Sequence, residues 1–332
     1  MSKAETPVLA VRGSTGISVN RGPPSYDPVT SFPRINSKKC RAMVFSPNGQ
    51  YFAWSDGAII SVVSVATWKT VVEIEKPKTM FISFSPNGTY LNSWETFYVS
   101  PEHPKGTPNL FIWRSATGEL AQAYIQKKQM NWEPRYSKDE RICARCVDGQ
   151  VLFYEKGDFE TPVYKINSPK VEGFSLSPGS VCHALCYMPG NSGPSFGKLF
   201  RYPKFEMCVA SKTFFKADKV DMYWNNKGVN ALLLTSTETD KTGASYYGKM
   251  SLHFLSTKGD TAIVLLNKEG PIYNVSWSPR GDEFCVVYGY MPAKAALFNE
   301  KCEVVFDFGS GPRNSIYFNP HGNYILLTQF LI

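Results

Sequence analysis

One short phrase recurs along the chain and limits what the chain can fold into. It consists of an apolar or aromatic residue, then Ser-Pro or a variant, a small turn and an apolar run. Four clear copies are at 44–49, 83–88, 276–281 and 317–322, and three weaker ones are at 135–140, 175–179 and 223–228. Their fourth positions are 39 to 53 residues apart. A period of about 40–45 residues with insertions is typical of β-propeller blades.

The chemistry of this phrase explains its form. Proline fixes φ and lacks an N–H group at the point where the chain turns. Asn-Gly, as in Asn48-Gly49 and Asn87-Gly88, accepts the positive φ of a tight hairpin. Because the apolar runs are short and show no amphipathic helical pattern, the sequence predicts an all-β chain. A two-sheet sandwich is the alternative fold, but it gives no reason for a phrase that returns about every 40 residues.

A second phrase, an apolar strand followed by a polar turn, comes at the right distance after the first. It occurs at 110–114, 151–155, 252–256 and 296–299. In WD40 repeats this strand ends in Trp-Asp, and Trp113-Arg114 is the nearest match here. Outer strands are expected at 120–125, 263–266 and 304–308. Together these patterns predict a divergent, WD40-like β-propeller.

The copies also predict how the chain is divided. We expect an N-terminal segment, 1–39, whose strand-like stretches Val8–Arg12 and Ile17–Asn20 pair with an open edge and close the ring. Residues 40–332 are expected to form about six complete blades and a partial seventh, because only two strands remain for the last copy. We therefore expect this chain to be a fragment of a larger propeller.

Composition favours a cytoplasmic binding protein. Lys and Arg exceed Asp and Glu by 36 − 28 = 8, a mildly basic balance that suits either an RNA partner or solubility alone. The N-terminus has no apolar core of a signal peptide, and no run is long enough to span a membrane. The eight cysteines are therefore expected as reduced thiols.

The sequence stretches that resemble catalytic or metal-binding motifs each lack a required feature. Gly243–Met250 nearly spells a phosphate-binding loop, but Met250 replaces the required hydroxyl and a strand follows instead of a helix. Cys143 and Cys146 have an offset that places them on opposite faces of a strand, which argues against zinc. The four histidines are scattered. We expect no catalytic residue, cofactor or metal site.

Basic clusters with aromatic neighbours are the candidate binding residues. Lys127 and Lys128 precede Asn131-Trp132, and Lys212, Lys216 and Lys219 surround Phe214-Phe215. Cations beside aromatic faces grip phosphates and allow bases to stack. The competing interpretation is that these lysines only extend over packed aromatic side chains.

Several longer phrases resemble the eukaryotic translation initiation factor 2A family. They lie at 124–128, 211–220, 240–248, 269–273, 287–294 and 305–314, and the resemblance runs from about Val8 to about Leu327. The resemblance implies a nine-bladed propeller followed by a charged, helical region. It also implies codon-dependent, GTP-independent delivery of initiator methionyl-tRNA to the small (40S) ribosomal subunit.

With this resemblance, Lys127, Lys128, Lys212, Lys216, Lys219 and Arg313 are the expected phosphate contacts. The expected partners are the small ribosomal subunit, initiator tRNA, mRNA and other initiation factors, with no membrane. Two alternatives stay open. One is a protein-interaction scaffold like the propeller of the initiation factor 3 b-subunit, and the other is a propeller enzyme with polar groups in its central channel.

Overall fold

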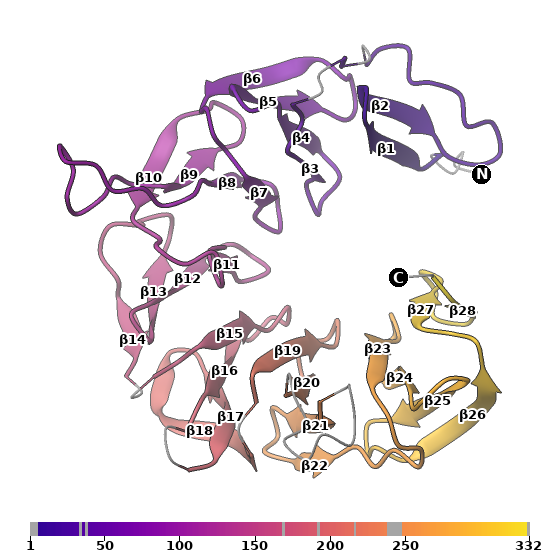
Figure 1. Ribbon diagram of the computed structural model, residues 1–332. Coiled ribbons are helices and arrows are strands. Elements are labelled where there is room, and N and C mark those ends of the chain that lie inside the picture. Colours follow the sequence, from indigo (N-terminus) through magenta and orange to yellow (C-terminus); the bar gives the residue numbers. More distant parts are fainter. Residues whose placement is uncertain are drawn as a thin grey trace. The chain divides into compact units, whose positions relative to one another are not determined.

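The structure is a computed structural model that describes residues 6–32, 35–36, 39–167, 170–190, 193–215, 217–237 and 248–330. Within these ranges every helix or strand assigned is a β-strand, and the strands number 28 (Figure 1). No helix of the described part is long and apolar enough to cross a membrane. The chain divides into two compact units, which are described separately.

The first unit contains Met1–Arg145 and Tyr154–Thr161. It holds one two-stranded and two four-stranded antiparallel sheets among its described residues. The two-stranded sheet is β1 (Val8–Gly13) and β2 (Gly16–Arg21). The four-stranded sheets are β3 (Ala42–Phe45), β4 (Tyr51–Ser55), β5 (Ile59–Ser64) and β6 (Thr70–Glu75), then β7 (Phe81–Phe84), β8 (Tyr90–Trp94), β9 (Leu110–Arg114) and β10 (Leu120–Tyr124).

A further four-stranded sheet contributes residues to both units. Its strands, in order, are β11 (Arg135–Tyr136), β12 (Ile142–Val147), β13 (Gln150–Glu155) and β14 (Tyr164–Ile166).

The second unit contains Cys146–Phe153 and Pro162–Ile332. Three four-stranded antiparallel sheets and one two-stranded sheet lie in its described part. The strands are β15 (Gly173–Leu176), β16 (His183–Met188), β17 (Ser195–Arg201) and β18 (Lys204–Phe214); β19 (Lys219–Trp224), β20 (Asn230–Ser236), β21 (Met250–Ser256) and β22 (Thr261–Ile263); β23 (Ile272–Trp277), β24 (Glu283–Tyr288), β25 (Ala293–Asn299) and β26 (Val304–Gly311); and β27 (Ser315–Phe318) with β28 (Ile325–Thr328).

The second strands of the three four-stranded sheets in this unit, β16, β20 and β24, bury both of their faces. In β24, Phe284 and Val286 pack into a core shared with the sheet β19–β22, while Cys285 and Val287 pack against β27 and β28. In β20, Leu232 and Leu234 face the sheet β23–β26, whereas Ala231 and Leu233 face β15–β18. Since side chains alternate across a strand, successive sheets of this unit must stack face to face in chain order. The same packing joins β3–β6 to β7–β10 in the first unit.

Each copy of the repeated phrase forms the turn between the first and second strands of a sheet. In six of the seven copies, the side chain of the Ser or Asn accepts the N–H group of the residue at the start of the second strand or immediately before it. Ser85 accepts the N–H of Tyr90 at 2.9 Å, and Asn319 accepts that of Tyr324 at 2.9 Å. In six of the seven copies the turn also contains a residue with positive φ, which is Gly88 in the first example (φ 72). The phrase at 135–140 supplies Glu140 there (φ 58), which explains why that copy is weak.

The turns of neighbouring sheets bond to one another within each unit. In the first unit, Asn48 Nδ2 donates to the carbonyl of Asn87. In the second unit, Asn225 Nδ2 donates to the carbonyl of Gly281 at 2.8 Å, and Arg280 Nε donates to that of His321 at 3.3 Å. We call this end of each sheet the turn end. The chain leaves the fourth strand for the next sheet at the opposite end, which we call the connection end.

One expected strand has different bounds in the structure. The outer strand expected at 263–266 is β22, Thr261–Ile263, because the tight turn at Lys258-Gly259 (φ 103 at Gly259) sets its register against β21. The N-terminal stretches pair with each other as β1 and β2, and their side chains Ile17 and Val19 pack against the sheet β3–β6. The all-β prediction is confirmed. The number of blades, the boundary at 39/40 and the ring-closing role stay predictions.

Candidate nucleic-acid interface

The described predicted binding residues lie on segments between sheets or near the strand ends that these segments join. Lys127 and Lys128 lie in the connection from β10 to β11, and Arg313 lies in that from β26 to β27. Lys212 lies two residues before the end of β18, and Lys219 begins β19. Lys216 lies outside the described residues. Their shared placement at the connection ends follows from the antiparallel order of the strands.

A buried amide holds the segment that carries Lys127 and Lys128. Asn109, 2% exposed, donates from Nδ2 to the carbonyls of Glu95 (2.8 Å) and Gln126 (2.9 Å). Its Oδ1 accepts the N–H of Gln126 at 2.7 Å. Three bonds from one side chain thus fix the start of the β10–β11 connection against the end of β8. Lys127 and Lys128 are exposed and take part in no ion pair among the described residues.

Lys212 and Lys219 differ in their surroundings. The half-buried Lys212 lies near enough to His253 that its charge, after burial, helps to lower the pKa of that imidazole to about 4. Lys219 Nζ lies 2.9 Å from the carboxylate of Asp221, so its charge is partly neutralised. Between them Phe215 is 91% exposed. Lys212 therefore offers a freer charge to a phosphate than Lys219 does.

Arg313 is directed towards its own chain. Its Nη1 lies 3.5 Å from the carbonyl of Phe308, and its charge acts on the buried thiol of Cys285. Burial is the larger effect and raises the pKa of that thiol to about 12. This half-buried arginine stabilises the end of β26 and is the least available of the described candidates.

The described cysteines form no metal site, and most of the loop that resembles a phosphate-binding motif lies outside the described residues. No group of three or more His, Cys, Asp or Glu side chains there is placed to hold a metal ion. Cys143 is 3% exposed, and burial raises the pKa of its thiol to about 12. Residues 243–247 lie outside the described residues, and the chain continues from Met250 into β21, as expected.

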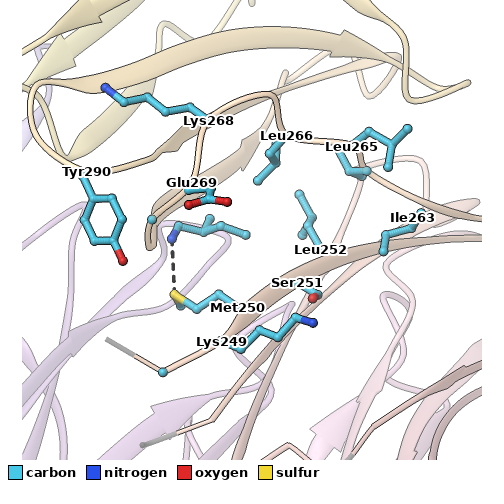
Figure 2. A pocket seen from close by; sticks show the side chains of 14 residues that line it. Lys249, Met250, Ser251, Leu252, Ile263, Leu265, Leu266, Lys268, Glu269 and Tyr290 are labelled. Atoms are coloured by element: carbon cyan, nitrogen blue, oxygen red, sulfur yellow. Dashed lines mark hydrogen bonds between the residues drawn. The ribbon is translucent and has the colours of Figure 1, made fainter. Parts of the chain in front are cut away.

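A pocket of about 490 Å³ opens at the connection ends of the sheets β19–β22 and β23–β26 (Figure 2). Its walls come from the start of β21, the segment from Ile263 to Ile272, and Tyr290. Leu252 and Leu266 supply apolar surface, and the carboxylate of Glu269 and the amine of Lys249 lie among the lining groups. The N–H of Ile272 donates to Met250 Sδ at 3.2 Å. Such a mixed lining suits an apolar side chain carried by a charged peptide.

Sequence reasoning missed Asn109 and the loop 95–109 in front of it. The loop contains Pro101, Pro104 and Gly106, and its aromatic pair Phe97-Tyr98 was the only available signal of binding. No sequence pattern indicates that a buried asparagine forms hydrogen bonds that fix a neighbouring loop.

Four-stranded antiparallel sheets that stack face to face, each entered through a Ser- or Asn-based turn, define a WD40-like β-propeller. The C-terminal WD40 domain of Sif2 shares this fold, with a TM-score of 0.58 at 13% identity, over 98% of this chain and 90% of that one.

A crystal structure described as that of the eukaryotic initiation factor is much more similar. It is 32% identical, with a TM-score of 0.88, and the match covers 98% of this chain and 78% of that chain. Eukaryotic translation initiation factor 2A of Drosophila melanogaster is 46% identical over 98% of this chain and 53% of its own length. The family model for eukaryotic translation initiation factor eIF2A matches residues 212–331. The chain therefore belongs to the eukaryotic translation initiation factor 2A family.

The chain spans about half the length of the curated relatives it matches, 53% for the fly protein and 58% for that of Caenorhabditis elegans. The b-subunit of eukaryotic translation initiation factor 3 from Xenopus laevis is more distant, at 22% identity over 86% of this chain.

Proposed function

We propose that this chain is a cytoplasmic, non-catalytic initiation factor that binds initiator methionyl-tRNA and the small (40S) ribosomal subunit, together with mRNA and other initiation factors. In this proposal, delivery depends on the codon and needs no GTP. One observation carries it beyond the family: exposed lysines without a carboxylate partner, Lys127 and Lys128, lie on a connection fixed by buried hydrogen bonds. Fixed cations of this kind suit phosphate contacts, which supply affinity and orientation.

Sedimentation of the 332-residue chain with small ribosomal subunits and labelled initiator tRNA tests this function. Binding is measured over a range of salt concentrations for three variants: Lys127→Ala/Lys128→Ala, Lys212→Ala/Lys216→Ala/Lys219→Ala, and the control Lys258→Ala. Lys258 is exposed at the turn end of β21 and β22.

Each phosphate contact that is lost should lower the slope of log affinity against log salt by roughly 0.7 to 0.9. Wild-type slopes in the first two variants would remove those lysines from the interface. The control should keep the wild-type slope.

A second candidate function is that of a protein-interaction scaffold, and the pocket in Figure 2 favours it. Leu265 is 77% exposed at its edge, where a partner would bury it. Pull-downs after RNase treatment, with the wild-type chain and Leu265→Asp, separate the two functions. A scaffold retains protein partners after RNase and loses them in Leu265→Asp. An RNA-dependent factor loses its partners on RNase treatment in either form.

A further inference from the structure

Two loops meet at the connection end of the sheet β7–β10. One is the loop 95–109 between β8 and β9, and the other is the segment 125–134 between β10 and β11. The Asn109 side chain bonds to both, as described above. Within the first loop, Gly106 has φ 83, and a Cβ added there would come within 2.3 Å of the Phe97 ring. The glycine therefore permits Phe97 to fold back over its own loop.

Aromatic rings line the place where these loops meet. Trp132 stacks with Phe81 at a centroid distance of 6.0 Å, and Phe81 lies 5.7 Å from Trp94. Lys127 Nζ lies 6.0 Å from the centre of the Phe97 ring. In the same two loops, Tyr98 is 68% exposed and Met130 is 72% exposed. We call Phe97, Tyr98, Lys127, Lys128, Met130 and Trp132 the aromatic platform.

The charges around the platform are unevenly paired. Glu95 is bound to Lys76 at 3.3 Å, and Glu133 is bound to Arg135 at 2.8 Å. The exposed lysines Lys127, Lys128 and Lys105 belong to no ion pair among the described residues, and Glu102 is the one carboxylate in either loop outside such a pair. The platform therefore has a cationic excess next to exposed ring faces.

We propose that the aromatic platform binds an unpaired segment of RNA, with a base stacked on Tyr98 and phosphates held by Lys127 and Lys128. This inference rests on the proposed function, of which it specifies the ligand and the surface. A ring beside a cation is the arrangement that proteins use for single strands, whereas paired bases leave no face for Tyr98. The aromatic residues and Met130 would also suit a protein interface, but the two lysines would not, since lysine is depleted there.

The test measures binding of a fluorescent 12-nucleotide oligouridine and of a 12-base-pair RNA duplex to the 332-residue chain. The variants are Tyr98→Ala, Tyr98→Trp and Lys127→Ala/Lys128→Ala. Tyr324→Ala is the control, since this tyrosine is 72% exposed on a different unit. Circular dichroism checks that each variant folds.

Tyr98→Ala should weaken oligouridine binding by roughly 5- to 100-fold, with an unchanged salt slope, since base–aromatic stacking contributes that much. Tyr98→Trp should bind at least as tightly as wild type. The double lysine variant should lower the salt slope by about 1.4, as two phosphate contacts are lost. Equal affinity for single strand and duplex, or no effect of Tyr98→Ala, would overturn the proposal.

The two proposals fail separately. Delivery of initiator tRNA to the small subunit by a chain that ignores oligouridine would overturn the platform and leave the proposed function standing. Oligouridine binding that depends on Tyr98, in a chain that binds neither initiator tRNA nor the small ribosomal subunit, would support the platform and remove the proposed function.

Discussion

Replacing Asn225 by alanine tests whether the turn residue of the repeat holds the sheets together. The Asn225 side chain is fully buried. Its Oδ1 accepts the N–H groups of Val229 (3.0 Å) and Asn230 (3.2 Å), and its Nδ2 donates to the carbonyl of Gly281 in the next sheet (2.8 Å). Alanine removes all three bonds. Val229 is 39% exposed and its N–H can bind water, but Asn230 and Gly281 are buried.

Most of the expected cost comes from two buried groups that lose their hydrogen-bond partner, the N–H of Asn230 and the carbonyl of Gly281. A buried donor or acceptor left unsatisfied costs about 1–3 kcal/mol, and the third bond adds about 1 kcal/mol. Asn225→Ala should therefore lower the free energy of unfolding by about 3–7 kcal/mol. Asn225→Ser keeps an acceptor for the N–H of Asn230, as Ser46 and Ser85 do for the equivalent N–H groups in their turns, and loses the bonds to Gly281 and to the partly exposed Val229. Its cost should be about 2–4 kcal/mol.

Urea denaturation measures the free energies, and hydrogen exchange of β19–β20 and β23–β24 amides locates the loss. Both are needed because stacked sheets need not unfold in a single step. The expected order of stability is wild type, then the serine variant, then the alanine variant. A cost below about 0.5 kcal/mol for alanine, or equal costs for both variants, would refute the role given to the turn acceptor.

Three more predictions follow from buried and paired charges. The pKa of His253 is lowered from 6.5 to about 4 by burial and then by Lys212, so the unfolded chain binds more protons between these values and stability falls as pH drops below 6.5. In urea titrations from pH 7 to pH 5, wild type should lose about 2 kcal/mol more stability than His253→Phe does. Equal pH dependence of the two proteins would contradict this. Exposed Cys208 should react with a thiol reagent in the folded chain, while Cys143 and Cys285, whose pKa burial raises to about 12, should react only on unfolding. Asp307→Asn breaks the 2.8 Å ion pair with Lys294 but should cost less than about 1 kcal/mol in the same titrations, since the carboxylate is 45% exposed; a larger loss would mean that the pair is not screened by solvent.

The repeated phrase was enough to predict the sheets because it contains both chemical requirements of a turn, a side-chain acceptor and a residue suited to positive φ. It placed all seven turns between first and second strands, including the weak copy with Glu140. Strand ends were harder to predict. The strand expected at 263–266 is shifted because register is set by the turn at Gly259 and not by apolar alternation.

The site could be predicted less well than the fold. The ion pair of Lys219 with Asp221 was predictable, since residues two apart on a strand share a face. The bonds from Asn109 to Gln126 and the packing of Arg313 against Phe308 were not, because they join residues through loop geometry that has no period. A cluster of cations in sequence therefore overstates how many of them are available to a ligand.

The two ends of the sheets have different roles, and this difference explains where the candidate ligand sites lie. At the turn end, side chains such as Asn225 and Arg280 already donate to the carbonyl of the neighbouring turn. Replacing these side chains with ones suited to a ligand would remove these bonds and lower the free energy of unfolding. At the connection end the sheets are joined mainly by apolar cores, which consist largely of strand residues. The loops at this end can vary in length and composition, so the loop 95–109 and the pocket beside Tyr290 both occur there.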